Sequence, residues 1–134
     1  MNKKEIIDLL EQLNISKEEY VILSSSALVI RGIYDKAGDI DLAVTQNGLN
    51  MLNKQFKLID KGNNWFTVND KIECVLDETV KKEKYGEYYL QDIIQYYEFV
   101  KSRNREKDKL RLPILEEYIL RRKKWKYHLK KEIY

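Results

Sequence analysis

Apolar residues recur along the first part of the chain with two different spacings. From Ile6 to Leu13 they recur at helical spacing, which predicts an amphipathic helix over residues 3–13. The short apolar, β-prone run at residues 20–23 predicts a buried strand. A second helical segment begins near Ala27. Gly32 is its expected end, because glycine accepts the left-handed backbone that closes many helices.

The middle of the chain is typical of a small sheet with one intervening helix. Residues 39–45 predict a strand, and a helix opens at Asn47 or Gly48 and continues through Phe56. Three further strand candidates follow, at residues 57–60, 64–69 and 71–77. A turn signal separates the last two candidates, so residues 64–77 predict a β-hairpin.

The pattern is helical from about Leu90 to the end of the chain. Its apolar positions form two stripes, one of Ile93, Ile94, Tyr97 and Val100 and one of Leu115, Ile119, Trp125, Leu129 and Ile133. Pro113 predicts the start or a break of a helix, because proline lacks the backbone N–H that a helix interior uses. The order of elements predicts an α/β (α+β) fold, in which helices flank a small mixed β-sheet and further helices follow at the C-terminus.

The length of 134 residues predicts a single domain over residues 1–134, with its core at about 18–80 and a C-terminal helical segment at about 88–134. No apolar stretch approaches the roughly 20 residues that span a bilayer, and charges interrupt the N-terminus where a signal peptide needs an apolar segment. We therefore expect a cytoplasmic protein without a membrane partner. The single cysteine, Cys74, excludes an internal disulfide and a zinc site built from cysteines.

The net charge of +3 conceals an asymmetry between two parts of the chain. Residues 1–100 carry 12 basic and 17 acidic residues, a net charge of −5, whereas residues 101–134 carry 13 basic and 5 acidic residues, a net charge of +8. An acidic first part and a basic tail fit a metal site beside a surface that attracts phosphate. A solvated helix face is the simpler interpretation of the basic run.

Asp39 and Asp41 are the strongest candidates for chemistry, because they lie two residues apart in a strand that is otherwise apolar. Residues two apart on a strand point to the same face, so the sequence places two carboxylates side by side. Burying two such charges without a partner is costly. A divalent cation relieves this cost, and Mg²⁺ binds one or two protein carboxylates together with substrate phosphates.

Two further segments complete a candidate phosphate-transfer site. The turn of Ser24, Ser25 and Ser26 precedes a helix, where hydroxyls and free backbone N–H groups suit phosphate. Glu73 is an acid within an apolar strand, which suits a third metal ligand or a base. The alternatives are a polar helix cap for the serines and a solvent-facing side chain for Glu73, with Asp70 and Asp77 as rivals for its role.

Together these residues resemble the DNA polymerase beta-like nucleotidyltransferase superfamily, which has a Gly-Gly or Gly-Ser turn, then Asp-x-Asp on a strand and a third acid on a later strand. The runs at residues 24–32 and 39–42 look like those of small bacterial nucleotidyltransferases of the abortive-infection toxin type. The resemblance covers about residues 18–112. It implies that Asp39, Asp41 and Glu73 are catalytic and hold Mg²⁺ (or Mn²⁺), with an NTP as substrate.

The resemblance also implies a role for a charged cluster on a later helix. By analogy, Lys101, Arg105 or Lys107 contacts the nucleotide phosphates and Asp108 positions one of them, while Ser24, Ser25 and Ser26 complete the nucleotide-binding set. An ordinary network of charges three residues apart on a helix surface is the alternative.

The chain departs from the family pattern around the acids. Ser24-Ser25 replaces the glycine pair, and Ala37, Asp35 and Arg111 stand where the family often has threonine, a basic residue and an acid. The expected activity is transfer of a nucleoside monophosphate from an NTP to an acceptor hydroxyl. The alternative is a catalytically degenerate module of the same fold that binds RNA, another nucleic acid or a partner protein, as one half of a toxin–antitoxin pair.

Overall fold

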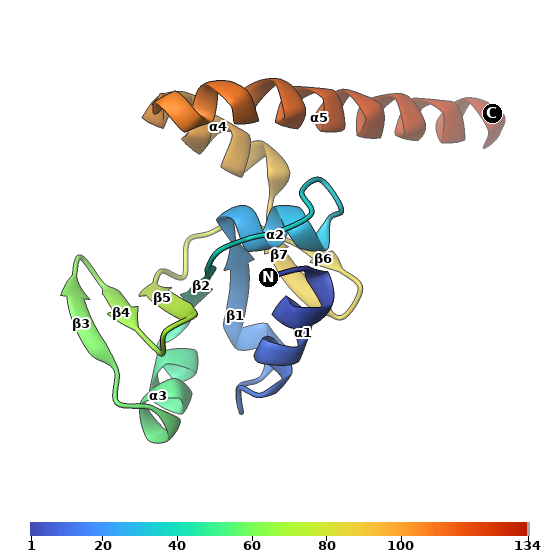
Figure 1. Ribbon diagram of the computed structural model, residues 1–134. Coiled ribbons are helices and arrows are strands. Elements are labelled where there is room, and N and C mark those ends of the chain that lie inside the picture. The colour runs from blue at the N-terminus through green and yellow to red at the C-terminus, as the bar shows by residue number, and fades with distance from the viewer. Residues whose placement is uncertain (134) are drawn as a thin grey trace. The chain divides into compact units, whose positions relative to one another are not determined.

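The computed structural model describes the backbone of residues 1–133 and the side chains of residues 1–123. The chain divides into two compact units, Met1–Asp92 and Ile93–Tyr134 (Figure 1). The stripe positions Trp125, Leu129 and Ile133 lie outside the described side chains.

The first unit carries a seven-stranded mixed sheet in the order β3-β4-β5-β2-β1-β7-β6. Its elements are α1 (Lys3–Glu11), the 3-10 turn η1 (Lys17–Glu19), β1 (Tyr20–Leu23), α2 (Ser24–Ile30), β2 (Ile40–Val44), α3 (Gln46–Gln55), β3 (Ile59–Gly62), β4 (Trp65–Thr67), β5 (Ile72–Leu76), β6 (Lys82–Tyr85) and β7 (Tyr88–Gln91). Strand β2 pairs antiparallel with β1 and parallel with β5. Strand β1 also runs parallel to β7, while the outer pairs β3–β4, β4–β5 and β6–β7 are antiparallel. The predicted mixed sheet with flanking helices is confirmed, including the hairpin of β4 and β5.

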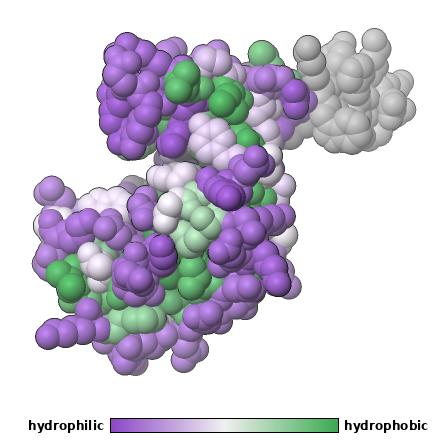
Figure 2. Space-filling view, in the orientation of Figure 1, coloured by the Kyte–Doolittle hydropathy of each residue, from purple (hydrophilic) through white to green (hydrophobic). Residues whose placement is uncertain are grey.

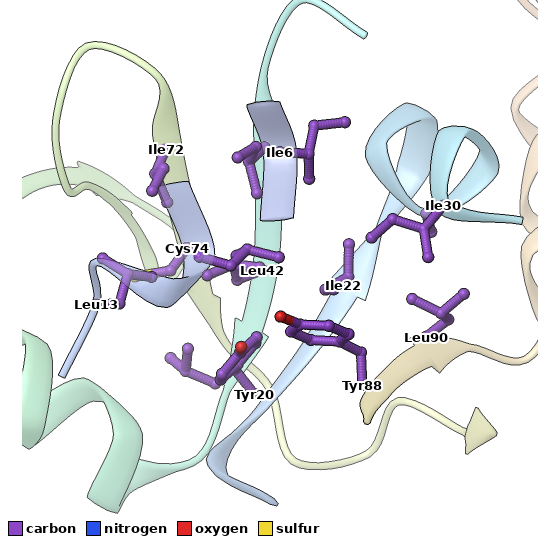
Figure 3. Packing of buried hydrophobic residues seen from close by; sticks show 14 of the residues in the cluster. Ile6, Leu13, Tyr20, Ile22, Ile30, Leu42, Ile72, Cys74, Tyr88 and Leu90 are labelled. Atoms are coloured by element: carbon purple, nitrogen blue, oxygen red, sulfur yellow. The ribbon is translucent and has the colours of Figure 1, made fainter. Parts of the chain in front are cut away.

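The core lies on one face of this sheet, beneath α1, α2 and α3 (Figure 3). Alternate strand residues supply it, as the strand periodicity of two requires. The fully buried members include Ile6 of α1, Ile22, Leu42 and Cys74 of three central strands, and Leu52 of α3. The intervening residues of the same strands therefore point to the opposite face of the sheet.

The helices of this unit begin with side-chain caps where the sequence supplies them. Asn2 and Glu5 form a reciprocal capping box at the start of α1. The Thr45 hydroxyl accepts a hydrogen bond from the backbone N–H of Gly48 at 3.0 Å and so caps α3. A Cβ on Gly48 would lie 2.6 Å from the carbonyl oxygen of Glu19, so this position requires glycine for close approach.

The hairpin of β6 and β7 was not predicted, and the expectation of a helix from about Leu90 is wrong because Leu90 lies in β7. Strand β6 is an edge strand of mostly exposed, charged residues, so it lacks the alternating apolar pattern of a half-buried strand. Tertiary contacts hold it instead. Arg31, at the end of α2, forms an ion pair with Glu83, and its Nη2 donates to the Gln91 carbonyl oxygen at 3.0 Å.

The second unit is helical, with α4 (Ile93–Arg103) followed by α5 (Glu106–Ile133). The predicted C-terminal helices are therefore confirmed. Pro113 lies inside α5, so the expectation that it starts or breaks a helix is wrong. Two buried side chains of α5, Leu115 and Ile119, belong to the predicted apolar stripe.

Hydrophilic side chains cover most of the visible surface of each unit, and hydrophobic side chains reach it in patches (Figure 2). Several large apolar side chains of the second unit are exposed, namely Ile94, Phe99, Leu110, Ile114 and Leu120. Over the described residues, no helix combines the length and the apolar character that crossing a bilayer requires.

Candidate functional site

Asp41 and Glu73 occupy facing positions on the two central parallel strands β2 and β5. The same row continues to Leu23 of β1, opposite Asp41, and to Thr67 of β4, opposite Glu73. Facing residues of neighbouring strands share one face of the sheet. The structure thus brings together two acids that lie 32 positions apart in the sequence.

This acidic row lies on the sheet face opposite α1, α2 and α3. The flanking strand residues Ile40, Leu42, Ile72 and Cys74 all point into the core beneath those helices. The next row on the acidic face is apolar and consists of Val21, Ala43, Val75 and Trp65, of which Val21 and Ala43 are buried. The acids therefore border a hydrophobic strip, which limits their hydration on one side.

Asp41 is half-buried, and its surroundings disfavour its charge. Burial is the largest cause that raises the pKa of Asp41, followed by the negative charges of Glu73 and Asp39, while the positive charge of Lys61 lowers it. A carboxylate held beside two others is a group that a cation stabilises. This perturbation marks Asp41 as a functional-site candidate on physical grounds.

Asp39 lies just before β2 and is exposed, so the expectation that the strand begins at residue 39 is one residue too early. The backbone N–H of Ile40 donates to the Lys71 carbonyl oxygen at 2.9 Å, which holds the end of β2 beside β5. Asp39 acts on Asp41 through its charge. It is therefore the one member of the acidic set that lies outside the two paired strands.

Lys61 of β3 is the one basic member of this site that sequence reasoning missed. Its Nζ lies 2.6 Å from Oε1 of Glu73 and forms an ion pair with it. In the sequence, Lys61 precedes Gly62-Asn63-Asn64 and carries only a turn signal. Its position beside Glu73 arises from sheet pairing across β4, which no local pattern encodes.

The three acids are hard oxygen donors, which suits Mg²⁺ or Mn²⁺ in chemistry and in charge. Among the residues with described side chains, no three His, Cys, Asp or Glu side chains are arranged as a ready metal-binding group. Asp41 and Glu73 are the two that the strand register holds together. A cation at this site would therefore be held by Asp41 and Glu73, with Asp39 as the neighbouring third carboxylate.

Ser24, Ser25 and Ser26 are the first three residues of α2, so the expectation of a turn that precedes a helix beginning near Ala27 is wrong. They follow β1 directly and lie beside the acidic row, because Leu23 faces Asp41. Ser24 has a φ of 51°, the left-handed backbone that a glycine adopts at lower cost. Strained positions of this kind persist where surrounding structure imposes them, often at functional sites. The buried Ser26 hydroxyl donates to the Leu23 carbonyl oxygen at 3.1 Å, which leaves Ser24 and Ser25 as the half-exposed hydroxyls at the start of α2.

The second unit contains the remaining residues of the predicted nucleotide-binding set. Asp108 is buried near the start of α5, where it accepts hydrogen bonds from Arg103 Nη2 at 2.7 Å and from the Arg105 backbone N–H at 2.9 Å. The bond to Arg103 is the first cause that holds the pKa of Asp108 well below its usual range. Lys101 and Lys107 are exposed. Asp108 thus joins α4 to α5 and orients Arg105, whose side chain also contacts it.

Comparison with family models, with curated proteins and with solved structures gives no match.

Proposed function

We propose that this protein is a metal-dependent nucleotidyltransferase, and that Asp41, Glu73 and Asp39 form its acidic centre. The observation that carries the proposal is the pairing of Asp41 with Glu73 across the parallel strands β2 and β5, on the sheet face away from α1, α2 and α3. Burial raises the pKa of Asp41, and crowding by the negative charges of Glu73 and Asp39 raises it further. Such crowding favours a bound cation.

Each group of the first unit has a proposed task. A divalent cation, when bound, neutralises phosphate charge and polarises the phosphoryl group. Asp41 and Glu73 would hold that cation, with Asp39 as a further ligand, and Ser24 and Ser25 at the start of α2 would bind the terminal phosphates of an NTP. The acceptor hydroxyl oxygen attacks the α-phosphorus, Glu73 takes its proton, and pyrophosphate leaves with the electrons of the broken P–O bond.

The test is calorimetric titration of the wild-type protein with ATP, GTP, CTP and UTP in the presence of Mg²⁺. We expect binding of at least one nucleotide that depends on the metal and is lost in Asp41→Asn. The matched control is Asp35→Asn, which removes the same charge from an exposed loop position. The proposal is contradicted if Asp41→Asn binds nucleotide as tightly as Asp35→Asn does. It is also contradicted if none of the four nucleotides binds to the wild-type protein.

A second candidate function is a non-enzymatic module that binds a nucleic acid or a partner protein through the second unit. The exposed apolar and basic side chains of α4 and α5 favour it, including Phe99, Leu110 and Lys107. The basic run at residues 121–126 contributes to this candidate, although Lys124, Trp125 and Lys126 lie outside the described side chains. A gel shift with RNA that is unchanged by Asp41→Asn and lost on removal of residues 121–134 supports it. A shift that Asp41→Asn abolishes speaks against it.

A further inference from the structure

Lys61 places a positive charge within the acidic row of the first unit. Its ammonium nitrogen lies 2.6 Å from Glu73 Oε1. Its charge also acts on Asp41, the facing residue of Glu73 on β2. One lysine therefore serves as counter-ion to both acids that the strand register holds together.

A β-bulge in β3 presents this lysine. The register of β3 against β4 shifts between Asp60 and Gly62, which leaves Lys61 at the irregular position. The Gly62 backbone N–H donates to Asp60 Oδ1 at 2.8 Å, and Gly62 has a φ of 87°, so local contacts stabilise the bulge. Bulges are common beside active sites, where they redirect a side chain. Here the redirected side chain reaches across β4 to Glu73 on β5.

The charges at this position are not balanced by the lysine alone. Asp39, Asp41 and Glu73 carry three negative charges when ionised and Lys61 carries one positive charge, which leaves a deficit that a divalent cation matches. The pair of Lys61 and Glu73 is partly exposed, at 45% and 35% of their side-chain surfaces, so the ammonium is free to move away into solvent. Exposed ion pairs of this kind are weak and exchange readily.

We infer that Lys61 is a built-in competitor of the divalent cation, which occupies Glu73 in the metal-free protein and releases it when a metal binds. Lys61 keeps Asp41 and Glu73 together before the metal arrives, because it relieves their repulsion. It also lowers the affinity for the metal, because the metal must displace it. This inference rests on the proposed function, since it assumes that the acids are a metal site.

The test compares Mn²⁺ binding without nucleotide in Lys61→Met and Lys57→Met, each measured by calorimetry and by thermal unfolding. Lys57 is an exposed lysine just before β3, so its substitution removes the same overall charge and leaves the ion pair of Lys61 with Glu73 in place. We expect Lys61→Met to bind Mn²⁺ about two- to fivefold more tightly than Lys57→Met, which is the size of effect that an exposed ion pair produces. In EDTA we expect Lys61→Met to melt at a lower temperature than Lys57→Met. Lys61→Arg restores the positive charge and is expected to return both values toward wild type.

Two failures of this test have different signatures. If Mn²⁺ binding depends on Asp41 but is equal in Lys61→Met and Lys57→Met, or is weaker in Lys61→Met, the inference about Lys61 is overturned while the metal site stands. If Lys57→Met binds no Mn²⁺, or binds it equally well after Asp41→Asn is added, the proposed metal site itself is overturned. The proposed role of Lys61 is then overturned as well.

Discussion

Replacing Asp41 with asparagine is expected to stabilise the first unit while removing its proposed metal binding. Asparagine has nearly the shape of aspartate, so the packing of β2 between β1 and β5 is preserved. The substitution removes one of the three negative charges that crowd this end of the sheet. A site that binds a cation is commonly less stable when empty than an uncharged equivalent, because its charges are held together by the fold.

The magnitude follows from the distance between neighbouring strands. Strands lie about 4.8 Å apart, and two unit charges about 5 Å apart repel by roughly 0.8 kcal/mol at the dielectric constant of water and roughly 3 kcal/mol at an effective value of 20. Glu73 is 35% exposed and paired with Lys61, which places the repulsion near the lower figure. A gain of about 1 kcal/mol raises the melting temperature of a unit of this size by about 4–8 °C.

The assay is thermal unfolding of Asp41→Asn and of the control Asp35→Asn over a range of pH in EDTA. The pKa of Asp41 is raised above its ordinary value of 3.8, so the folded protein holds this proton more tightly than the unfolded chain. The contribution of Asp41 to the free energy of unfolding therefore decreases as pH rises from 3.8 through the raised pKa of the folded state. The advantage of Asp41→Asn should be present at neutral pH and should disappear below pH 3.8.

The reasoning is refuted if Asp41→Asn melts at or below the temperature of Asp35→Asn at neutral pH. The same conclusion follows if the difference between the two variants is independent of pH, because a packing effect does not titrate. Either result means that burial and the charges of Glu73 and Asp39 do not disfavour the ionised form of Asp41 in the folded protein.

Three further outcomes test other parts of the structure. Gly48→Ala should destabilise the first unit by about 1–3 kcal/mol, since the added Cβ meets a backbone oxygen at 2.6 Å. Gly38→Ala should leave the stability unchanged, because the added Cβ has open space around it. Equal melting temperatures of Gly48→Ala and Gly38→Ala would contradict the close approach of Gly48 to the Glu19 carbonyl oxygen. Burial raises the pKa of the Cys74 thiol to about 11, so this thiol should react with a thiol reagent only in denaturant. Rapid reaction of the native protein would show that Cys74 is not buried as described. Asp108→Asn should speed amide exchange at the turn between α4 and α5, most clearly above the ordinary carboxyl pKa, where the stabilisation from the lowered pKa of Asp108 is fully present. Glu106→Gln, which removes only an exposed pair, should leave that exchange unchanged.

The sequence predicted the central elements well where hydrophobic periodicity reports burial directly. Strands β1, β2 and β5 are short apolar runs, and their alternate residues build the core in the structure. The acids Asp41 and Glu73 were detectable because a carboxylate within such a run is out of place. The edge strand β6 gave no such signal, because its residues are mostly exposed and charged and it is held by tertiary contacts such as the ion pair of Glu83 with Arg31.

The two-residue spacing of Asp39 and Asp41 was visible in the sequence, but their environment was not. Only the parallel pairing of β2 with β5 decides that Asp41 faces Glu73, and only the bulge of β3 brings Lys61 to the same place. Local sequence encodes periodicity and turn chemistry, which act over a few residues. The sequence by itself thus determined which residues are acidic, apolar or turn-forming, while the register of non-local strands decided which charges meet and how strongly each perturbs the others.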